Sequence, residues 1–241
     1  MPPRSIHMKW VTIPLLSAAI ISVIACDRKA DAGAKPENGR ALKLLDLSPV
    51  ELGELTASYY ENASEDSSFL SSAEYLEVEA AHGPVFKKQL IAAIQNAASI
   101  TIEEHSDPVD FASSDRPHPE NPPRYVYRSV KLPDDQKLAF LRAAEDMDSK
   151  TVSLTPACFT PHHRMEFIRD NGQPSSMSIC FQCGNINWAE ANLFHPNGIF
   201  TVLEAVVIGA GLKSERDWRA LAKQRSEQNA AEQPATRPES K

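Results

Sequence analysis

The sequence lacks an excess of positive charge, because its 25 Lys and Arg residues are outnumbered by 32 Asp and Glu, which leaves a net charge of −7. Nucleic acids and anionic lipid surfaces are bound largely through Lys and Arg, so this composition argues against both as electrostatic partners. Glycine is also scarce, with nine residues against eighteen prolines, which predicts stiff connecting segments. No internal repeat is visible, which argues against a solenoid.

The sequence offers no apolar run long enough for a membrane-spanning helix. The longest run, at residues 10–24, is uncharged but covers only roughly 15 residues, and a span needs about 20. Arg4 and Lys9 precede it, a pattern typical of a signal peptide. The run ends in Val-Ile-Ala followed by Cys26, which resembles the lipobox of bacterial lipoproteins and implies lipidation of Cys26. A plain secretory signal cleaved after Cys26 and an uncleaved anchor are the alternatives.

These features predict the organisation of the chain. We expect a lipoprotein signal peptide at 1–25, a flexible tether at 26–47, a single domain at 48–227 and a disordered tail at 228–241. The protein would lie on the extracytoplasmic face of a bacterial cell membrane, held in the lipid bilayer by its acyl chains. An envelope protein is the expected partner, and nucleic acid is not.

The pattern of the predicted domain favours an α+β fold, an antiparallel sheet with packed helices. Helix starts are expected at Ser48-Pro49, at Pro84 and at Pro133, and a last helix near 214–217. Period-two alternation and turn residues predict the remaining elements. The expected strands are 100–102, 125–131, 151–155, 164–169, 177–181 and 186–188, with a long irregular loop at 106–123 and a helix at 198–211 that ends at Gly211.

Cysteine is scarce as well, and its distribution is uneven. Of the four cysteines, Cys158, Cys180 and Cys183 lie within one stretch, so lipidation of Cys26 would leave three. An exported protein can form disulfides, but three is an odd number and one bridge would leave a spare thiol. Cys180, Cys183 and Gly184 form a C-x-x-C-G turn, whose glycine supplies the left-handed conformation that points both sulfurs to one side.

A second set of soft ligands lies across one predicted hairpin. Asp170-Asn171-Gly172 is a strong turn signal, and folding there would bring Cys158 and either His162 or His163 beside the C-x-x-C turn. Three cysteines and one histidine make a complete tetrahedral shell for Zn²⁺. With no open position, such a zinc site would be structural, and the hairpin would resemble a zinc knuckle.

Other uses of these residues remain open at this point. The cysteines could form a disulfide with one thiol over, or stay reduced in the core. They could also exchange thiols, although the flanking strand pattern differs from the helix start at which redox C-x-x-C motifs usually lie. Cys158 with a neighbouring histidine has the residue types of a thiol hydrolase. Covalent haem is excluded, because Gly184 stands where histidine is required.

The residues of this stretch resemble a motif pair in a group of exported bacterial proteins of unknown activity. Cys158-Phe159-x-Pro161-x-His163 is similar to CF-x-P-R-H, and Ile179-Cys180-Phe181-x-Cys183 is similar to ICFEC one hairpin later. The resemblance implies that His163, rather than His162, is the histidine ligand. This sequence departs from the pattern at His162, where the group has Arg, and at Gln182, where the group has Glu.

The remaining titratable residues give no catalytic pattern. His82, His105, His118 and His195 are each expected at the surface, and no carboxylate pair has a spacing that marks acid–base catalysis. We therefore expect a non-catalytic envelope binding or assembly module with a structural Cys₃His zinc site. An envelope thiol-redox or metal-handling protein that uses the three cysteines is the alternative.

Overall fold

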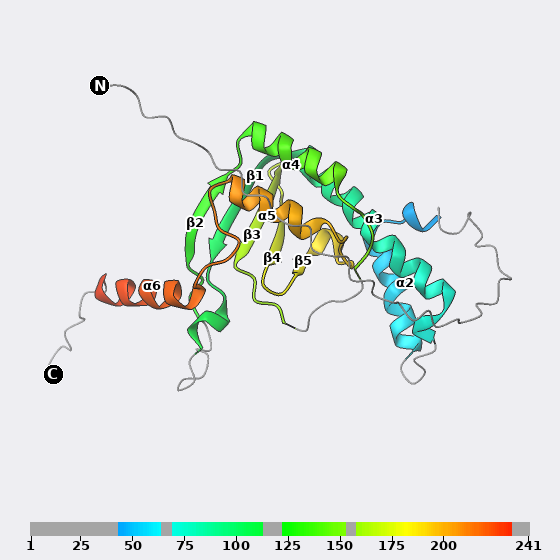
Figure 1. The fold of residues 1–241 in the computed structure, drawn as a ribbon, viewed down its shortest axis with the longest axis horizontal. Coiled ribbons are helices and arrows are strands. Elements are labelled where there is room, and N and C mark those ends of the chain that lie inside the picture. Colours follow the sequence, from blue (N-terminus) through cyan, green and yellow to red (C-terminus); the bar gives the residue numbers. More distant parts are fainter. Residues whose placement is uncertain (1–42, 64–68, 113–121, 153–157, 233–241) are drawn as a thin grey trace, which may run out of the picture. The chain divides into compact units, whose positions relative to one another are not determined.

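The structure is a computed structural model that describes residues 43–63, 69–112, 122–152 and 158–232 (Figure 1). Cys26, the predicted signal peptide and most of the predicted tether and tail lie outside these residues. No helix in the described ranges is long and apolar enough to cross a membrane. The main helices are α2 (Pro49–Asn62), α3 (Ala73–Asn96), α4 (Asp134–Asp146), α5 (Ile199–Gly209) and α6 (Trp218–Glu232), with 3₁₀ turns η1 (Phe69–Ser71), η2 (Pro108–Phe111) and η3 (Ala189–Ala191).

Five strands form one antiparallel sheet, which confirms the predicted α+β class. They are β1 (Ala97–His105), β2 (Val126–Lys131), β3 (His163–Arg169), β4 (Pro174–Cys180) and β5 (Asn185–Trp188), in the order β2-β1-β3-β4-β5. The β3–β4 hairpin turns at Asn171-Gly172 as predicted, and Gly172 has a φ of +79° there. The chain runs from β2 through α4 to β3, and β3 pairs with β1 on the side opposite to β2.

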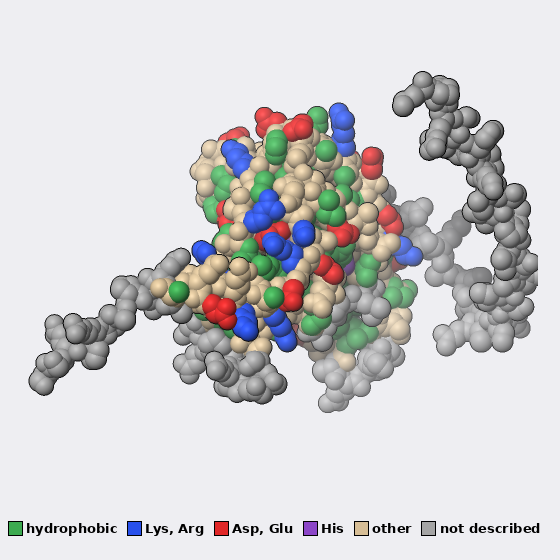
Figure 2. All heavy atoms as spheres, turned by 60° about the vertical axis from the view of Figure 1, so that its left-hand side comes forward, with side chains coloured by type: hydrophobic (Ala, Val, Ile, Leu, Met, Phe, Trp, Pro, Cys, Tyr) green, Lys and Arg blue, Asp and Glu red, His purple; other side chains and the backbone are tan. Residues whose placement is uncertain are grey.

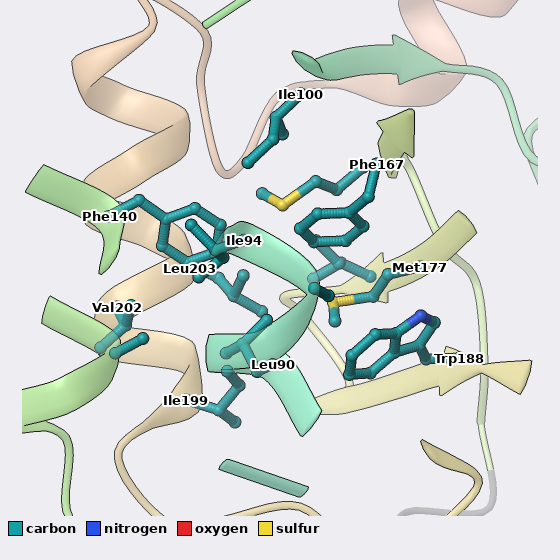
Figure 3. Packing of buried hydrophobic residues seen from close by; sticks show 14 of the residues in the cluster. Leu90, Ile94, Ile100, Phe140, Phe167, Met177, Trp188, Ile199, Val202 and Leu203 are labelled. Carbon is teal, nitrogen blue, oxygen red and sulfur yellow. The ribbon is translucent and has the colours of Figure 1, made fainter. Parts of the chain in front are cut away.

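One face of the sheet is apolar and is covered by α3, α4 and α5 (Figure 3). Ile100 pairs with Phe167 and Ile102 with Met165, so period-two alternation puts all four side chains on this face. They pack against helix residues such as Leu90, and the largest buried side chain of the cluster is Trp188. Burial of this one face explains the alternating pattern of the strands.

A second, smaller cluster joins α2 to the first half of α3, and includes Leu52, Tyr59 and Tyr75. The predicted start of α2 is confirmed: Ser48 caps the helix and forms a reciprocal capping box with Glu51. Leu44, which the sequence placed in the tether, is buried in this cluster.

The predicted helix start at Pro84 is wrong, because α3 begins at Ala73 and runs through Pro84. Proline has no N–H to donate to the carbonyl four residues earlier, and an unpaired carbonyl inside a helix is costly. The Thr151 hydroxyl takes over that role by donating to the Ala80 carbonyl at 2.9 Å, and it also accepts from the Gly83 N–H at 2.8 Å. A contact with a distant part of the chain therefore carries the helix past its proline.

The last two helices follow the prediction in part. Gly211 follows α5 with a φ of +75°, as expected of a helix-ending glycine. The expected helix start near 214 is wrong: α6 begins at Trp218, and Asp217 accepts from the Ala220 N–H at its first turn. Ser214 instead donates to Glu204 on α5. The helix α6 continues to Glu232, through residues placed in the tail.

Candidate functional site

The three cysteines near the β3–β4 hairpin come together in space as free thiols. Cys158 precedes β3 and is exposed, Cys180 is the last residue of β4, and Cys183 lies in the turn to β5. The sulfurs of Cys158 and Cys183 are 2.8 Å apart. The hairpin thus brings its two flanks side by side, as the sequence predicted, and we name these three residues the cysteine centre.

The backbone of the C-x-x-C-G turn supports the cysteine centre. Gly184 adopts the left-handed conformation with a φ of +61°, and its N–H donates to the Phe181 carbonyl. This closure turns the Cys183 N–H toward the Cys180 sulfur, which accepts it at 3.2 Å. The Thr160 hydroxyl lies 3.7 Å from both Cys180 and Cys183 sulfurs. No pattern in the sequence marks Thr160, because its role depends on the folded loop before β3.

The environment of the cysteine centre favours one thiolate. Burial opposes ionisation of Cys183, but hydrogen bonds from Cys158, Cys180 and Thr160 outweigh it and lower the Cys183 pKa to about 7. The pKa of Cys158 is raised, first by its hydrogen bond to Cys183, and burial raises the pKa of Cys180. Cys183 is therefore the thiolate that the other two thiols stabilise, and thiolates are the reactive and metal-binding form of cysteine.

The structure directs His163 away from the sulfurs with which the sequence grouped it. His163 pairs with Ile179 across the hairpin, so alternation puts it on the face opposite to the next residue, Cys180. Its Nε2 lies 2.8 Å from the Lys213 carbonyl, and its ring contacts Phe181 and Trp218 edge-on. Burial lowers the His163 pKa to about 4, so the ring is neutral at physiological pH.

His162, the alternative ligand, has another partner. Its Nε2 lies 2.9 Å from a carboxylate oxygen of Asp110 on η2, and its ring stacks on Trp218 at a centroid distance of 4.5 Å. Within the described ranges, no group of three or more His, Cys, Asp or Glu side chains is arranged to hold a metal ion. The zinc shell of Cys158, Cys180, Cys183 and His163 stays a prediction.

Three histidines expected at the surface are buried instead. His82 is 3% exposed, and it accepts from the Phe194 N–H through Nδ1 and contacts Thr56 through Nε2. His105 is buried at the end of β1, and His195 is buried with its Nε2 3.1 Å from the Gly184 carbonyl. His82 lies four residues from each of Val78 and Phe86, a helical spacing that indicates burial on the same face of α3. The predicted helix start at Pro84 leaves His82 outside the helix, so the sequence analysis missed this indication. His118 lies outside the described residues.

No protein-family model, curated protein or solved structure matches this chain. Evidence on function therefore comes from the geometry of the cysteine centre and from the chemistry of its three sulfurs. Its contacts place a stabilised thiolate at Cys183 beside an exposed thiol at Cys158. Such a pair can share a proton, form a disulfide or bind a thiophilic ion.

Proposed function

We propose that this chain is a lipid-anchored protein of the bacterial envelope whose cysteine centre exchanges thiols with disulfides. The observation that carries the proposal is the 2.8 Å contact between the sulfurs of Cys158 and Cys183, together with the lowered pKa of Cys183. The anchor at Cys26 is supported by the lipobox-like sequence, and exposure of Cys158 gives a partner access to the centre.

The sulfur–sulfur distance favours thiol exchange over a zinc shell. Two thiolates on one tetrahedral zinc, each with a Zn–S bond of about 2.3 Å, lie roughly 3.8 Å apart. The contact of 2.8 Å between Cys158 and Cys183 is about 1 Å shorter than that. The distance is about 0.8 Å longer than a disulfide bond of about 2.05 Å, so a small movement of the two side chains would allow the bond to form.

The reaction that we propose takes a disulfide of an envelope protein as the oxidant. Cys158 attacks one sulfur of that disulfide and passes its proton to the Cys183 thiolate, and the partner's first sulfur leaves as a thiolate. That leaving group then takes the proton from Cys183. The regenerated Cys183 thiolate attacks the Cys158 sulfur and releases the partner's second thiolate, which is protonated by water. The partner disulfide is reduced by two electrons, and Cys158–Cys183 becomes a disulfide.

A structural zinc site is the second candidate, and one contact favours it. The Cys183 N–H donates to the Cys180 sulfur, a contact that stabilises thiolate charge in a zinc knuckle. Zinc held by Cys158, Cys180 and Cys183 with a fourth ligand would supply stability rather than catalysis, in an envelope binding or assembly module.

Redox titration with metal analysis separates the two candidates. The full chain, purified without reductant or chelator, is equilibrated in glutathione buffers, and its cysteines are mapped by mass spectrometry after thiol trapping. Thiol exchange predicts a reversible Cys158–Cys183 disulfide, its loss in Cys158→Ser and in Cys183→Ser, and its retention in the control Cys180→Ser. About one zinc per chain with all three thiols protected supports the second candidate. Inert thiols without metal would contradict both.

A further inference from the structure

A basic pocket lies between β2 and α6. Its volume is about 290 Å³, close to the lower end of the range for small-molecule sites. The polar side chains that line it come from β2, from the connection to α6 and from α6 itself. They are Tyr127, Arg128, Arg216, Gln224, Arg225 and Gln228.

The charge of this pocket contrasts with that of the whole chain. Three arginines line it and none of its lining residues is acidic, whereas the chain carries a net charge of −7. Figure 2 brings the β2–α6 side of Figure 1 forward and shows Lys and Arg side chains gathered there. Clustered guanidinium groups repel one another unless an anion lies between them. The pocket therefore has the charge of an anion site.

Buried contacts position the first arginine. Arg216 donates through Nη1 to Glu104 at 2.7 Å, and Glu104 is fully buried on the sheet face. The other carboxylate oxygen of Glu104 accepts from the Lys213 N–H at 2.8 Å, which fixes the carboxylate. This ion pair neutralises one charge and holds the guanidinium in place. This bond uses one of the five N–H donors of the arginine, and the side chain also lines the pocket.

The other two arginines approach from separate elements. Arg128 on β2 donates through Nη1 to the Gly211 carbonyl, and Arg225 on α6 lies 3.4 Å from Gln228. Neither of these partners is an acid, so both positive charges remain uncompensated by these contacts. Stacking of Tyr127 on Trp218, with ring centroids 6.2 Å apart, holds α6 against β2. The pocket is thus formed by fixed elements rather than by one surface helix.

We propose that this pocket binds a phosphate-bearing ligand, a site distinct from the cysteine centre. A carboxylate fits the fork of one guanidinium, whereas a phosphate has oxygens enough to accept from Arg128, Arg216 and Arg225 together. The glutamine amides can donate further hydrogen bonds, and Val126 and Leu221 supply an apolar part of the lining. A free phosphate ester and the headgroup of an anionic phospholipid share this chemistry.

Calorimetric titration of the full chain tests the proposal with two probes. The first probe is inorganic phosphate, and the second is phosphatidylcholine vesicles with and without phosphatidylglycerol. We expect saturable binding of at least one probe, weakened about tenfold or more in Arg225→Gln, because one charge-assisted hydrogen bond is lost. The matched control Arg142→Gln removes an exposed helix arginine that does not line the pocket, and it should stay within about twofold of the parent.

The two probes also distinguish the source of the phosphate. Saturable binding of inorganic phosphate indicates a soluble ligand, and binding only to vesicles that contain phosphatidylglycerol indicates a lipid headgroup. Either result, when lost in Arg225→Gln and kept in Arg142→Gln, supports the site. The proposal is overturned if neither probe binds, or if both variants lose affinity equally.

Discussion

The hydroxyl of Thr151 donates to the carbonyl of Ala80, 71 positions earlier in the chain, at 2.9 Å. That carbonyl is the one that Pro84 leaves without its helical N–H donor. The same hydroxyl accepts from the Gly83 N–H, so one side chain serves both a donor and an acceptor of α3. A side chain from a distant segment therefore replaces the helical hydrogen bond that Pro84 cannot make.

Replacement of Thr151 by valine should therefore destabilise the fold. Valine keeps the shape but removes the hydroxyl, which leaves the Ala80 carbonyl without this partner and costs about 1–3 kcal/mol. Chemical denaturation measures the free energy of unfolding. Thr201→Val, on the exposed side of α5, is the matched control and should change it by less than about 0.5 kcal/mol. Equal effects of the two substitutions would contradict this role.

The backbone of residues 149–151 lies so close to α3 that it leaves no room for a side chain at Gly83. A Cβ there would lie 2.2 Å from the Ser149 carbonyl oxygen and 2.9 Å from the Thr151 nitrogen, and both are backbone atoms. Gly83→Ala should cost at least about 3 kcal/mol in denaturation experiments. Gly209→Ala, in open space on α5, should instead stabilise the protein by up to about 1 kcal/mol through helix propensity. A tolerated Gly83→Ala would show that the approach of residues 149–151 is looser.

Glu104 and its sequence neighbour Glu103 provide a comparison between a buried and an exposed ion pair. Glu104→Gln removes the charge that pairs with Arg216 in a fully buried position, and we expect a loss of about 2 kcal/mol or more. Glu103→Gln breaks an exposed pair with Arg124 and should cost less than about 1 kcal/mol. Thermal or chemical unfolding of both variants measures the difference, and a larger effect at Glu103 would refute the assignment.

Alkylation at controlled pH tests the thiolate at Cys183. Its pKa of about 7 means that half of Cys183 is thiolate near neutral pH, so its labelling rate should rise through pH 7. Cys158→Ala removes a thiol that donates to Cys183, and the midpoint should move to higher pH. Iodoacetamide labelling read by peptide fragmentation resolves Cys183 from Cys180. An unchanged midpoint in Cys158→Ala would contradict the proposed stabilisation.

His82 should make the fold sensitive to acid. Burial, which disfavours the charged ring, lowers its pKa from 6.5 to about 4. The neutral ring also accepts a hydrogen bond from the Phe194 N–H, which a charged ring could not accept. Since the folded pKa lies below the unfolded one, stability is complete above pH 6.5 and falls as the pH drops toward 4, by on the order of 3 kcal/mol.

His82→Gln isolates this contribution. The variant should be less stable than the parent at neutral pH, because two buried hydrogen bonds are disturbed, but its stability should fall less between pH 6.5 and 4. Denaturation midpoints at several pH values measure the difference. His163 is present in both proteins, so its own acid response cancels in the comparison. Parallel pH profiles would show that His82 does not titrate in this way.

Local features of the sequence were sufficient to predict part of the fold. The capping box of Ser48 and Glu51, the Asn171-Gly172 turn and the left-handed glycines Gly184 and Gly211 act within a few residues. Alternation along the strands follows from burial of one sheet face, so the α+β class could also be predicted. The gathering of three cysteines follows from one hairpin.

Contacts between distant residues decided the rest. Pro84 reads as a helix start, and only the Thr151 hydroxyl lets α3 continue through it. The sequence placed His163 and Cys180 in one ligand set, but the pairing of His163 with Ile179 sends their side chains to opposite faces of the sheet. Strand register and hydrogen bonds across the chain are set by packing of the whole domain, and a local pattern does not contain them.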